Sequence, residues 1–203
     1  MRMLAIDCST EACSVALFDG DELVAGDHRI LGRGHAEQLV PMIAALPDKG
    51  RAERIVCALG PGSFTGIRIG IATARALGIA WRAEVLGYPT FSLIAARSYQ
   101  REPRPVTVCM NGGHGEWFVQ NFADGTHAED EVRSLPPGDA ALACRHQLIV
   151  GNRAHELAAL LGDTRTALDL MPDARQADLL SPGLFQAEMK PLYGRGPDAK
   201  LPQ

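Results

Sequence analysis

The chain has 203 residues, of which 46% are hydrophobic and 22% charged, which are ordinary values for a globular protein with its own core. Its formal net charge of −4 argues against a domain that binds nucleic acid by itself, because such domains carry a clustered basic surplus. The five cysteines include no CxxC pair, and no apolar run approaches the ~18 residues of a membrane span. We therefore expect buried, reduced thiols in a cytoplasmic protein without membrane contact.

The first half of the chain alternates between strand and helix patterns. The expected elements are strands at 3–8, 12–18 and 22–30, a helix at 35–46, a strand at 55–59, a helix at 65–81, a strand at 85–88 and a helix at 90–99. Three successive strands predict a meander, which argues against the strand–helix–strand start of dinucleotide-binding folds. Pro41 predicts a kink or a late start in the first helix, and Thr65 is the expected N-cap of the second.

The second half repeats this opening in shortened form after a polar, proline-rich segment at 100–105. Its expected elements are strands at 106–110, 117–122, 126–132 and 148–150, and helices at 154–161 and 179–188. We therefore divide the chain into residues 1–100 and 101–203. Two lobes that each begin with a strand, a polar turn and a strand predict an α/β, two-lobed actin-like (ASKHA, ribonuclease H-like) fold with a reduced second lobe. In that fold the two turns face each other across a cleft.

The turn of the first lobe carries residues that can hold a phosphate. Asp7 ends a strand, and its carboxylate can anchor Mg²⁺ through water while Ser9 and Thr10 donate to phosphate oxygens. An ordinary turn, in which Asp7 and Ser9 cap local backbone groups, explains the same residues. The matching turn of the second lobe begins with Asn111 and has no acid before Glu116, which can point away. The missing second carboxylate argues against efficient phosphoryl transfer.

Other catalytic motifs are weak. The six histidines form no HxxxH or HExxH pattern, and His35 and Glu37, near a helix start, are expected to be capping residues at the surface. Ser63 loosely matches a nucleophile elbow, but Thr65 stands where that motif needs glycine. We expect no metal site, no cofactor and no catalytic residue.

The glycine-rich segment 60–70 leads from a strand into a helix and offers free amides at the helix N-terminus. It has neither the lysine of a P-loop nor the spacing of a GxGxxG motif. The segment is therefore either an anion contact or simply the turn that this topology requires. The candidate nucleotide or anion contacts are Asp7, Ser9, Thr10, Gly62 and Ser63.

Small residues recur every four positions in the helix that follows, at Gly66, Gly70, Ala74 and Gly78. Glycine inside a helix costs about 0.8–1.0 kcal/mol relative to alanine, so a close neighbour is expected on this face. The helix is apolar nearly all round and needs cover on both sides, part of which the helix at 35–46 supplies. We expect the two helices to form an exposed patch that docks on another subunit, so that Gly70→Leu or Ala74→Trp disrupts association and leaves the fold largely intact. The expected partner-binding residues are Leu39, Met42, Ile43, Leu46, Ile67, Gly70, Ile71, Ala74 and Gly78.

Four stretches resemble the TsaB (YeaZ) family, a bacterial subunit in threonylcarbamoyladenosine biosynthesis on tRNA. They are Asp7-Cys-Ser-Thr10, Gly34-His-Ala-Glu-Gln-Leu-Val-Pro-Met-Ile43, Gly60-Pro-Gly-Ser-Phe-Thr-Gly-Ile-Arg-Ile-Gly70 and Pro191-Leu-Tyr-Gly-Arg-Gly-Pro-Asp-Ala-Lys200. The resemblance spans the whole chain and is strongest over the first ninety residues. It departs at 111–117, where the family usually shows an Asp-Ala-Arg-x-Gly-Glu turn, so it implies no role for Asn111–His114.

The resemblance implies a non-catalytic subunit that pairs, through the two helices of its first lobe, with a TsaD-like paralogue. That paralogue transfers the threonylcarbamoyl group to the adenosine beside the anticodon. A TsaE-like ATPase joins the pair, tRNA is contacted only through the complex, and the chain forms a homodimer when the partner is absent. The alternative is an active nucleotide-dependent kinase or ATPase of the actin-like fold, which magnesium-dependent ATP turnover by the purified chain would reveal.

Overall fold

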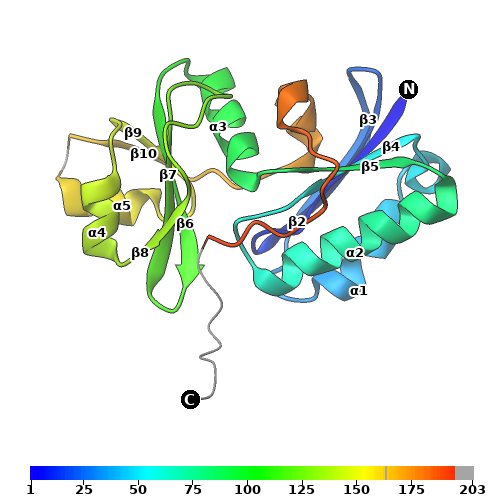
Figure 1. Ribbon diagram of the computed structural model, residues 1–203, viewed down its shortest axis with the longest axis horizontal. Coiled ribbons are helices and arrows are strands. Elements are labelled where there is room, and N and C mark those ends of the chain that lie inside the picture. Colours follow the sequence, from blue (N-terminus) through cyan, green and yellow to red (C-terminus); the bar gives the residue numbers. More distant parts are fainter. Residues whose placement is uncertain (163, 195–203) are drawn as a thin grey trace.

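The computed structural model describes residues 1–162 and 164–194, which form two lobes, each built on a five-stranded mixed sheet (Figure 1). The first sheet has the order β3-β2-β1-β4-β5, with strands β1 (Arg2–Asp7), β2 (Ala12–Asp19), β3 (Glu22–Ile30), β4 (Arg54–Ala58) and β5 (Glu84–Tyr88). β1 runs antiparallel to β2 and parallel to β4. The predicted meander is therefore confirmed, and β1 lies at the centre of the sheet.

The second sheet repeats this topology. Its order is β10-β9-β6-β7-β8, with strands β6 (Val106–Gly113), β7 (Glu116–Phe122), β8 (Arg133–Leu135), β9 (Leu148–Val150) and β10 (Thr166–Leu168). β6 runs antiparallel to β7 and parallel to β9, as β1 does with β2 and β4. Three of the five strands have only three residues. The two-lobed actin-like fold with a reduced second lobe is thus confirmed.

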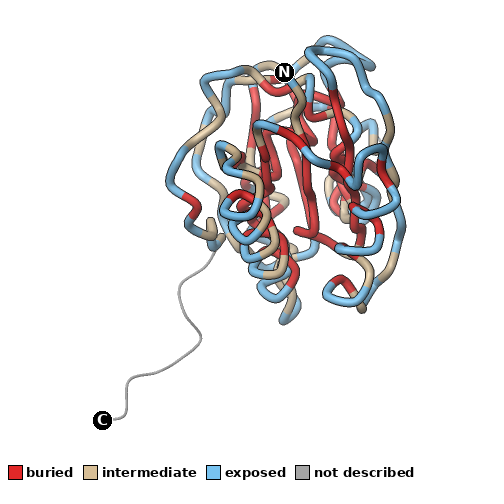
Figure 2. The backbone as a smooth tube through the Cα atoms, turned by 90° about the vertical axis from the view of Figure 1, so that its right-hand side faces the viewer, coloured by how far each residue is buried: buried red, intermediate tan, exposed pale blue. Residues whose placement is uncertain are grey.

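The helices cover the sheets in layers. They are α1 (His35–Ala44), α2 (Phe64–Trp81), α3 (Thr90–Arg101), α4 (Pro137–Ala143) and α5 (Ala154–Leu161), and a short 3-10 turn at Pro47–Gly50 follows α1. α1 and α2 share a buried core with one face of the first sheet, and α4 and α5 cover the second sheet in the same way. α3 lies between the lobes, because Leu93 packs on the first sheet while Phe91 and Ile94 pack on the second (Figure 1). Figure 2 shows the buried strands at the centre and helices whose turns alternate between buried and exposed.

Two predicted elements are wrong. Residues 126–132 form no strand, because the Asp124 carboxylate accepts hydrogen bonds from the backbone amides of Thr126 and His127 (2.7 and 2.9 Å) and holds a turn. The strand begins later, as β8, and the sequence patterns also missed α4 and β10. α1 begins at His35 and runs through Pro41, so the late start is wrong as well.

The predicted helix at 179–188 is the other error. Short 3-10 helices at Ala174–Leu179 and Pro182–Leu184 replace it, and Gln186 forms an antiparallel bridge with Gly87 of β5. Pro182 limits helix formation here, and the edge of β5 offers backbone groups to pair with. The chain thus returns from the second lobe to the first. The division at residue 100 stays a prediction, since both α3 and this returning segment contact the first lobe.

Candidate functional site

The glycine-rich segment packs against the first hairpin turn. Ser63 caps α2, its Oγ accepting a hydrogen bond from the Gly66 amide at 3.2 Å, so the predicted cap at Thr65 is wrong. The Ser63 amide donates to the Ser9 carbonyl at 2.6 Å. A Cβ on Gly62 would lie 1.9 Å from that same carbonyl oxygen, which explains the glycine. The segment therefore holds the turn in place. The backbone amide of Ser63 is hydrogen-bonded within the protein in doing so.

The stripe of small residues on α2 faces the sheet. A Cβ on Gly66 would lie 2.0 Å from the Cys8 carbonyl oxygen, and one on Gly70 would lie 3.2 Å from Cys57 Sγ. Gly78 is equally close to Val85, where a Cβ would come within 2.2 Å of Cγ2. The small side chains thus let α2 approach β1, β4 and β5 of its own lobe.

The nine expected partner-binding residues are all buried inside the lobe. They are Leu39, Met42, Ile43, Leu46, Ile67, Gly70, Ile71, Ala74 and Gly78. The expectation that these side chains form an exposed patch is wrong, because α1 and α2 turn their most apolar faces toward their own sheet. These buried residues pack α1 and α2 onto the first sheet.

The opposite side of α1 and α2 is exposed and mostly apolar. Val40 is 55% exposed and Ile79 is 83% exposed, and an exposed alanine lies one helical turn from each. We use the name outer helical face for Val40, Ala44, Ala72, Ala76 and Ile79, which are all exposed. Their spacing of three or four residues places them on one side of each helix. Sequence periodicity missed this face because alanine weakens the contrast between the two sides.

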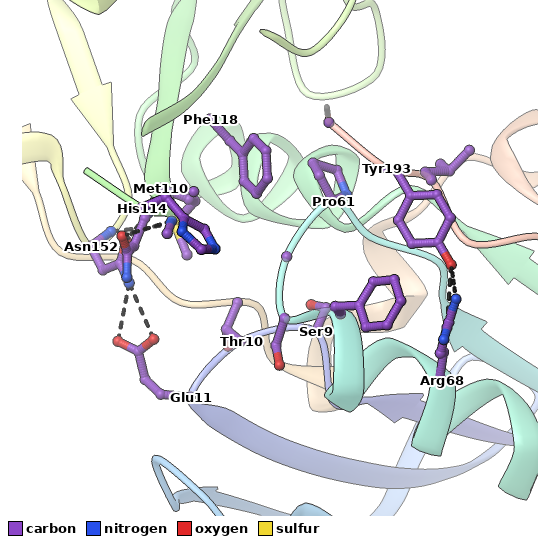
Figure 3. A pocket seen from close by; sticks show the side chains of 18 residues that line it. Ser9, Thr10, Glu11, Pro61, Arg68, Met110, His114, Phe118, Asn152 and Tyr193 are labelled. Atoms are coloured by element: carbon purple, nitrogen blue, oxygen red, sulfur yellow. Dashed lines mark hydrogen bonds between the residues drawn. The ribbon is translucent and has the colours of Figure 1, made fainter. Parts of the chain in front are cut away.

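A cavity of about 820 Å³ lies between the lobes (Figure 3). Its walls come from the turn after β1, the 61–63 loop, the start of α2, the turn after β6 and the segment 192–194. Both hairpin turns line it, as the sequence predicts for this fold. Apolar side chains, including Met110, Phe118 and Leu192, make up much of the surface.

Asp7 does not belong to this cavity. Its side chain is 1% exposed and accepts hydrogen bonds from the Ser9 amide (2.9 Å), the Ser9 hydroxyl (2.6 Å) and the Tyr88 hydroxyl (3.3 Å). Burial raises the pKa of this carboxyl to about 6. The expectation that Asp7 faces a ligand is therefore wrong, since the carboxyl is occupied within the protein.

The other four candidate contacts do line the cavity, but their hydroxyls have internal partners. The Ser9 hydroxyl donates to Asp7, and the Thr10 hydroxyl accepts from the Ala12 amide at 3.1 Å. Ser63 caps α2, and Gly62 contributes only backbone. The Ser9 hydroxyl thus uses its proton inside the protein, whereas the Thr10 and Ser63 hydroxyls accept a hydrogen bond and keep a proton to donate.

Glu11 is a cavity residue that the sequence patterns missed. Both of its carboxylate oxygens accept hydrogen bonds from the Asn152 side-chain amide, at 3.0 and 3.3 Å (Figure 3). The Oδ1 atom of Asn152 in turn accepts a hydrogen bond from the backbone amide of Asn111 at 2.8 Å. A carboxylate of the protein itself thus lies where the two turns meet. Its place beside Thr10 was visible in the sequence, but its partner lies 141 residues away.

The second turn supplies no acid to the cavity. Glu116 points to β8, where its Oε2 accepts a hydrogen bond from the Ser134 hydroxyl at 2.5 Å. Within residues 1–162 and 164–194, no three His, Cys, Asp or Glu side chains come together as a metal site. The turn at 111–115 contains no acidic residue, so Glu116 was the nearest carboxylate that the sequence offered.

His35 supports the first turn from behind. It is buried, and its Nε2 lies 2.9 Å from the Thr10 carbonyl oxygen and 3.3 Å from that of Ala12. The prediction of a surface capping residue is wrong for His35. Its imidazole instead fixes the backbone of the turn.

The segment 192–194 closes one side of the cavity. The Leu192 amide donates to the Leu59 carbonyl at 2.7 Å, and the Tyr193 ring stacks on Phe64 with ring centroids 5.5 Å apart. Arg68 donates to the Tyr193 hydroxyl at 3.0 Å (Figure 3). These contacts join the end of the described chain to the start of α2.

No helix among the described residues has the length and apolar character needed to cross a membrane.

Comparison with known proteins decides the family. The family model described as TsaD, tRNA N6-adenosine threonylcarbamoyltransferase, matches residues 29–169. Over 147 residues the chain is 38% identical to the Escherichia coli K12 protein named tRNA threonylcarbamoyladenosine biosynthesis protein TsaB, covering 68% of this chain and 63% of that protein. The chain belongs to the TsaB (YeaZ) branch of the TsaD family.

Further relatives agree with this membership. TsaB from Bacillus subtilis strain 168 is 36% identical over 134 residues, covering 64% of this chain and 52% of that protein. The match thus spans less than two thirds of the length of both curated TsaB proteins. Among solved structures, YeaZ from Pseudomonas aeruginosa superposes with a TM-score of 0.77 at 26% identity, covering 95% of this chain and 99% of that one. The two-lobed architecture described here is therefore that of a YeaZ protein.

Proposed function

We propose that this chain is a non-catalytic scaffold subunit that pairs with a TsaD-like protein in adding the threonylcarbamoyl group to the adenosine next to the anticodon of tRNA. Two curated relatives carry a name that places them in threonylcarbamoyladenosine biosynthesis, which supports the pathway. The matching family model is described as the transferase itself. A member of that family with a disabled cleft fits the role of a partner to the enzyme.

The cleft supports a role without catalysis. Phosphoryl transfer from a nucleoside triphosphate needs Mg²⁺ held by carboxylates, and it needs hydrogen-bond donors aimed at the phosphates. Here Asp7 is buried and hydrogen-bonded internally, and the second turn offers no acid. Glu11 adds a negative charge where a polyphosphate would lie. This arrangement is the single observation that carries the assignment of a non-enzyme.

The outer helical face supports the docking role. Soluble monomers rarely expose contiguous apolar patches larger than a few hundred Å², and large patches commonly mark protein interfaces. Val40 and Ile79 are large and exposed, and each has an exposed alanine one helical turn away, Ala44 and Ala76, so a partner's helices can approach closely. Arg75 and Glu37 lie exposed beside them as a polar rim. The same face serves a second copy of the chain when the TsaD-like protein is absent.

The remaining partners follow from the resemblance to the TsaB family. A TsaE-like ATPase joins the pair and supplies the nucleotide hydrolysis that this chain lacks. The net charge of −4 fits contact with tRNA only through the complex. The cytoplasm, where tRNA is modified, is the proposed location.

Two measurements test the proposal. The purified chain mixed with a TsaD-like protein is expected to form a complex with the summed mass of both chains, as measured by light scattering after size-exclusion chromatography. The chain alone is expected to show no magnesium-dependent ATP turnover above that of a heat-denatured sample. Two separate masses at micromolar concentrations, or turnover that Asp7→Ala abolishes, would contradict it and favour the kinase or ATPase alternative.

A further inference from the structure

Two cysteines face each other at the base of the first hairpin turn. Asp7 of β1 pairs with Ser14 of β2, so the antiparallel register brings Cys8 opposite Cys13. Their Sγ atoms lie 3.5 Å apart in a hydrogen-bonded pair, and both side chains are buried. Neither thiol has a part in the proposed scaffold function.

We propose that Cys8 and Cys13 are a modification site, at which a two-electron thiol oxidant of the peroxide class forms a disulfide across the hairpin. A disulfide has an S–S length of about 2.05 Å, so the sulfur atoms must approach by roughly 1.5 Å. Facing residues of an antiparallel pair have Cα atoms about 4.5–5.5 Å apart, within the range of about 4.4–6.8 Å that disulfides span. Rotation about the side-chain bonds can therefore close most of the gap.

The reaction with hydrogen peroxide balances in two steps. One thiolate of the pair attacks the peroxide, forming an S–O bond and breaking the O–O bond, and the leaving hydroxide takes up a proton as water. The other cysteine then attacks the sulfenic sulfur, forming the S–S bond and breaking the S–O bond, and a second water leaves. One peroxide is reduced to two waters while two thiols are oxidised to one disulfide.

The surroundings separate this pair from the third thiol nearby. Either sulfur can donate the hydrogen bond within the pair, and that bond stabilises a thiolate on the sulfur that accepts it. Cys57, the other thiol near this site, lies on β4 under Gly70, and burial raises its pKa well above the ordinary value. Either thiol of the pair can therefore attack while the other resolves, and Cys57 is a spectator. Because both reacting thiols are buried, a molecule as small as peroxide is the suitable probe.

The disulfide would restrict the first hairpin turn, which contacts α2 and lines the inter-lobe cavity. The Cys8 carbonyl oxygen lies directly under Gly66 of α2, and Ser9 and Thr10 line the inter-lobe cavity. A bond to Cys13 would fix this turn relative to β2. In a reducing compartment the pair stays as thiols, so the site responds only when oxidant is present.

Peptide mapping of the native chain tests the proposal. After exposure to hydrogen peroxide, the protein is denatured with an alkylating agent and cleaved by trypsin. Residues 3–29 contain both Cys8 and Cys13 in one tryptic peptide, whereas Cys57 lies in the peptide 55–68. The expected product is peptide 3–29 without alkyl groups. Its mass is about 2 Da below that of the reduced, unalkylated peptide, because two hydrogen atoms leave on disulfide formation. Peptide 55–68 is expected to remain fully alkylated.

Other products would overturn the proposal. They are alkylation of both cysteines in peptide 3–29, a cross-link between peptides 3–29 and 55–68, or oxidation of single thiols only. Cys13→Ser is expected to abolish the mass loss, and Cys57→Ser is the control that should retain it. The wild-type mapping stands alone if a variant fails to fold, and it does not depend on whether a TsaD-like partner binds.

Discussion

Glu11 in the first lobe accepts two hydrogen bonds from Asn152 in the second, at 3.0 and 3.3 Å, across the point where the two hairpin turns meet. In a nucleotide-binding member of this architecture, phosphates would lie between such turns. Here a carboxylate of the protein lies there and ties the lobes together. The same residue thus opposes an incoming polyphosphate by charge and contributes to the fixed arrangement of the lobes.

This tie predicts an energetic coupling between the lobes. A hydrogen bond to a charged group contributes about 1.5–3 kcal/mol, so Glu11→Ala and Asn152→Ala should each lower the free energy of unfolding by about 1–2 kcal/mol. The double variant should lose less than the sum, with a coupling of about 1 kcal/mol in urea unfolding. Glu11→Ala combined with Asn121→Ala, elsewhere in the second lobe, should be additive. If the losses of unfolding free energy in Glu11→Ala and Asn152→Ala were additive, the hydrogen bonds between the two residues would not couple the lobes.

The contact between Gly66 and Cys8 predicts a steric effect on the fold. A methyl group at position 66 would lie 2.0 Å from the Cys8 carbonyl oxygen, so Gly66→Ala must push α2 away from β1. We expect a loss of about 1–3 kcal/mol in unfolding free energy, as for other overpacked cores. Gly138→Ala in α4 is the matched control, because nothing lies within 4 Å of its added Cβ. Equal stability of the two variants would show that α2 does not need this close approach.

The stripe on α2 also changes the prediction for larger side chains. Gly70 faces Cys57 and Ala74 is fully buried, so Gly70→Leu and Ala74→Trp should destabilise the protein. The sequence-based expectation of an intact fold is therefore replaced by one of partial or complete unfolding. Circular dichroism and thermal melting are the measurements, and a melting curve like that of the wild type would restore the earlier expectation.

Burial of Asp7 predicts a pH dependence of stability. Its pKa is about 6 in the folded protein against 3.8 as the ordinary value, so between these values the folded state holds a proton that the unfolded state has released. The unfolded state then binds fewer protons, and stability falls as pH rises through this window. Each pKa unit corresponds to about 1.4 kcal/mol, so the cost at neutral pH is on the order of 3 kcal/mol.

Asp7→Asn isolates this effect, because asparagine cannot ionise and other titrating groups are shared. The unfolding free energy of the wild type minus that of Asp7→Asn should fall by roughly 2–3 kcal/mol between pH of about 4 and about 7. Urea titrations at several pH values measure it. A difference that stays constant over this range would mean that Asp7 is ionised in the fold.

The sequence predicted most strands and helices because continuous apolar runs and strong periodicity are local signals. It assigned the wrong face of α2 because a helix that is apolar all round does not reveal which side meets the sheet. Glu11–Asn152 and Arg68–Tyr193 join residues 141 and 125 positions apart, which no local pattern encodes. The burial of Asp7 likewise depends on Tyr88, which a distant strand brings beneath the turn.

The central claim is that the outer helical face binds a TsaD-like protein, and one titration tests it most directly. Ile79→Arg puts a charge at the most exposed large apolar residue of α2, and Leu142→Arg makes the same change at an 87% exposed leucine of α4. Calorimetric titration with the TsaD-like partner should show Ile79→Arg at least about tenfold weaker than wild type, a loss of about 1.4 kcal/mol or more. Leu142→Arg should bind as the wild type does. Wild-type affinity of a folded Ile79→Arg chain would contradict the claim.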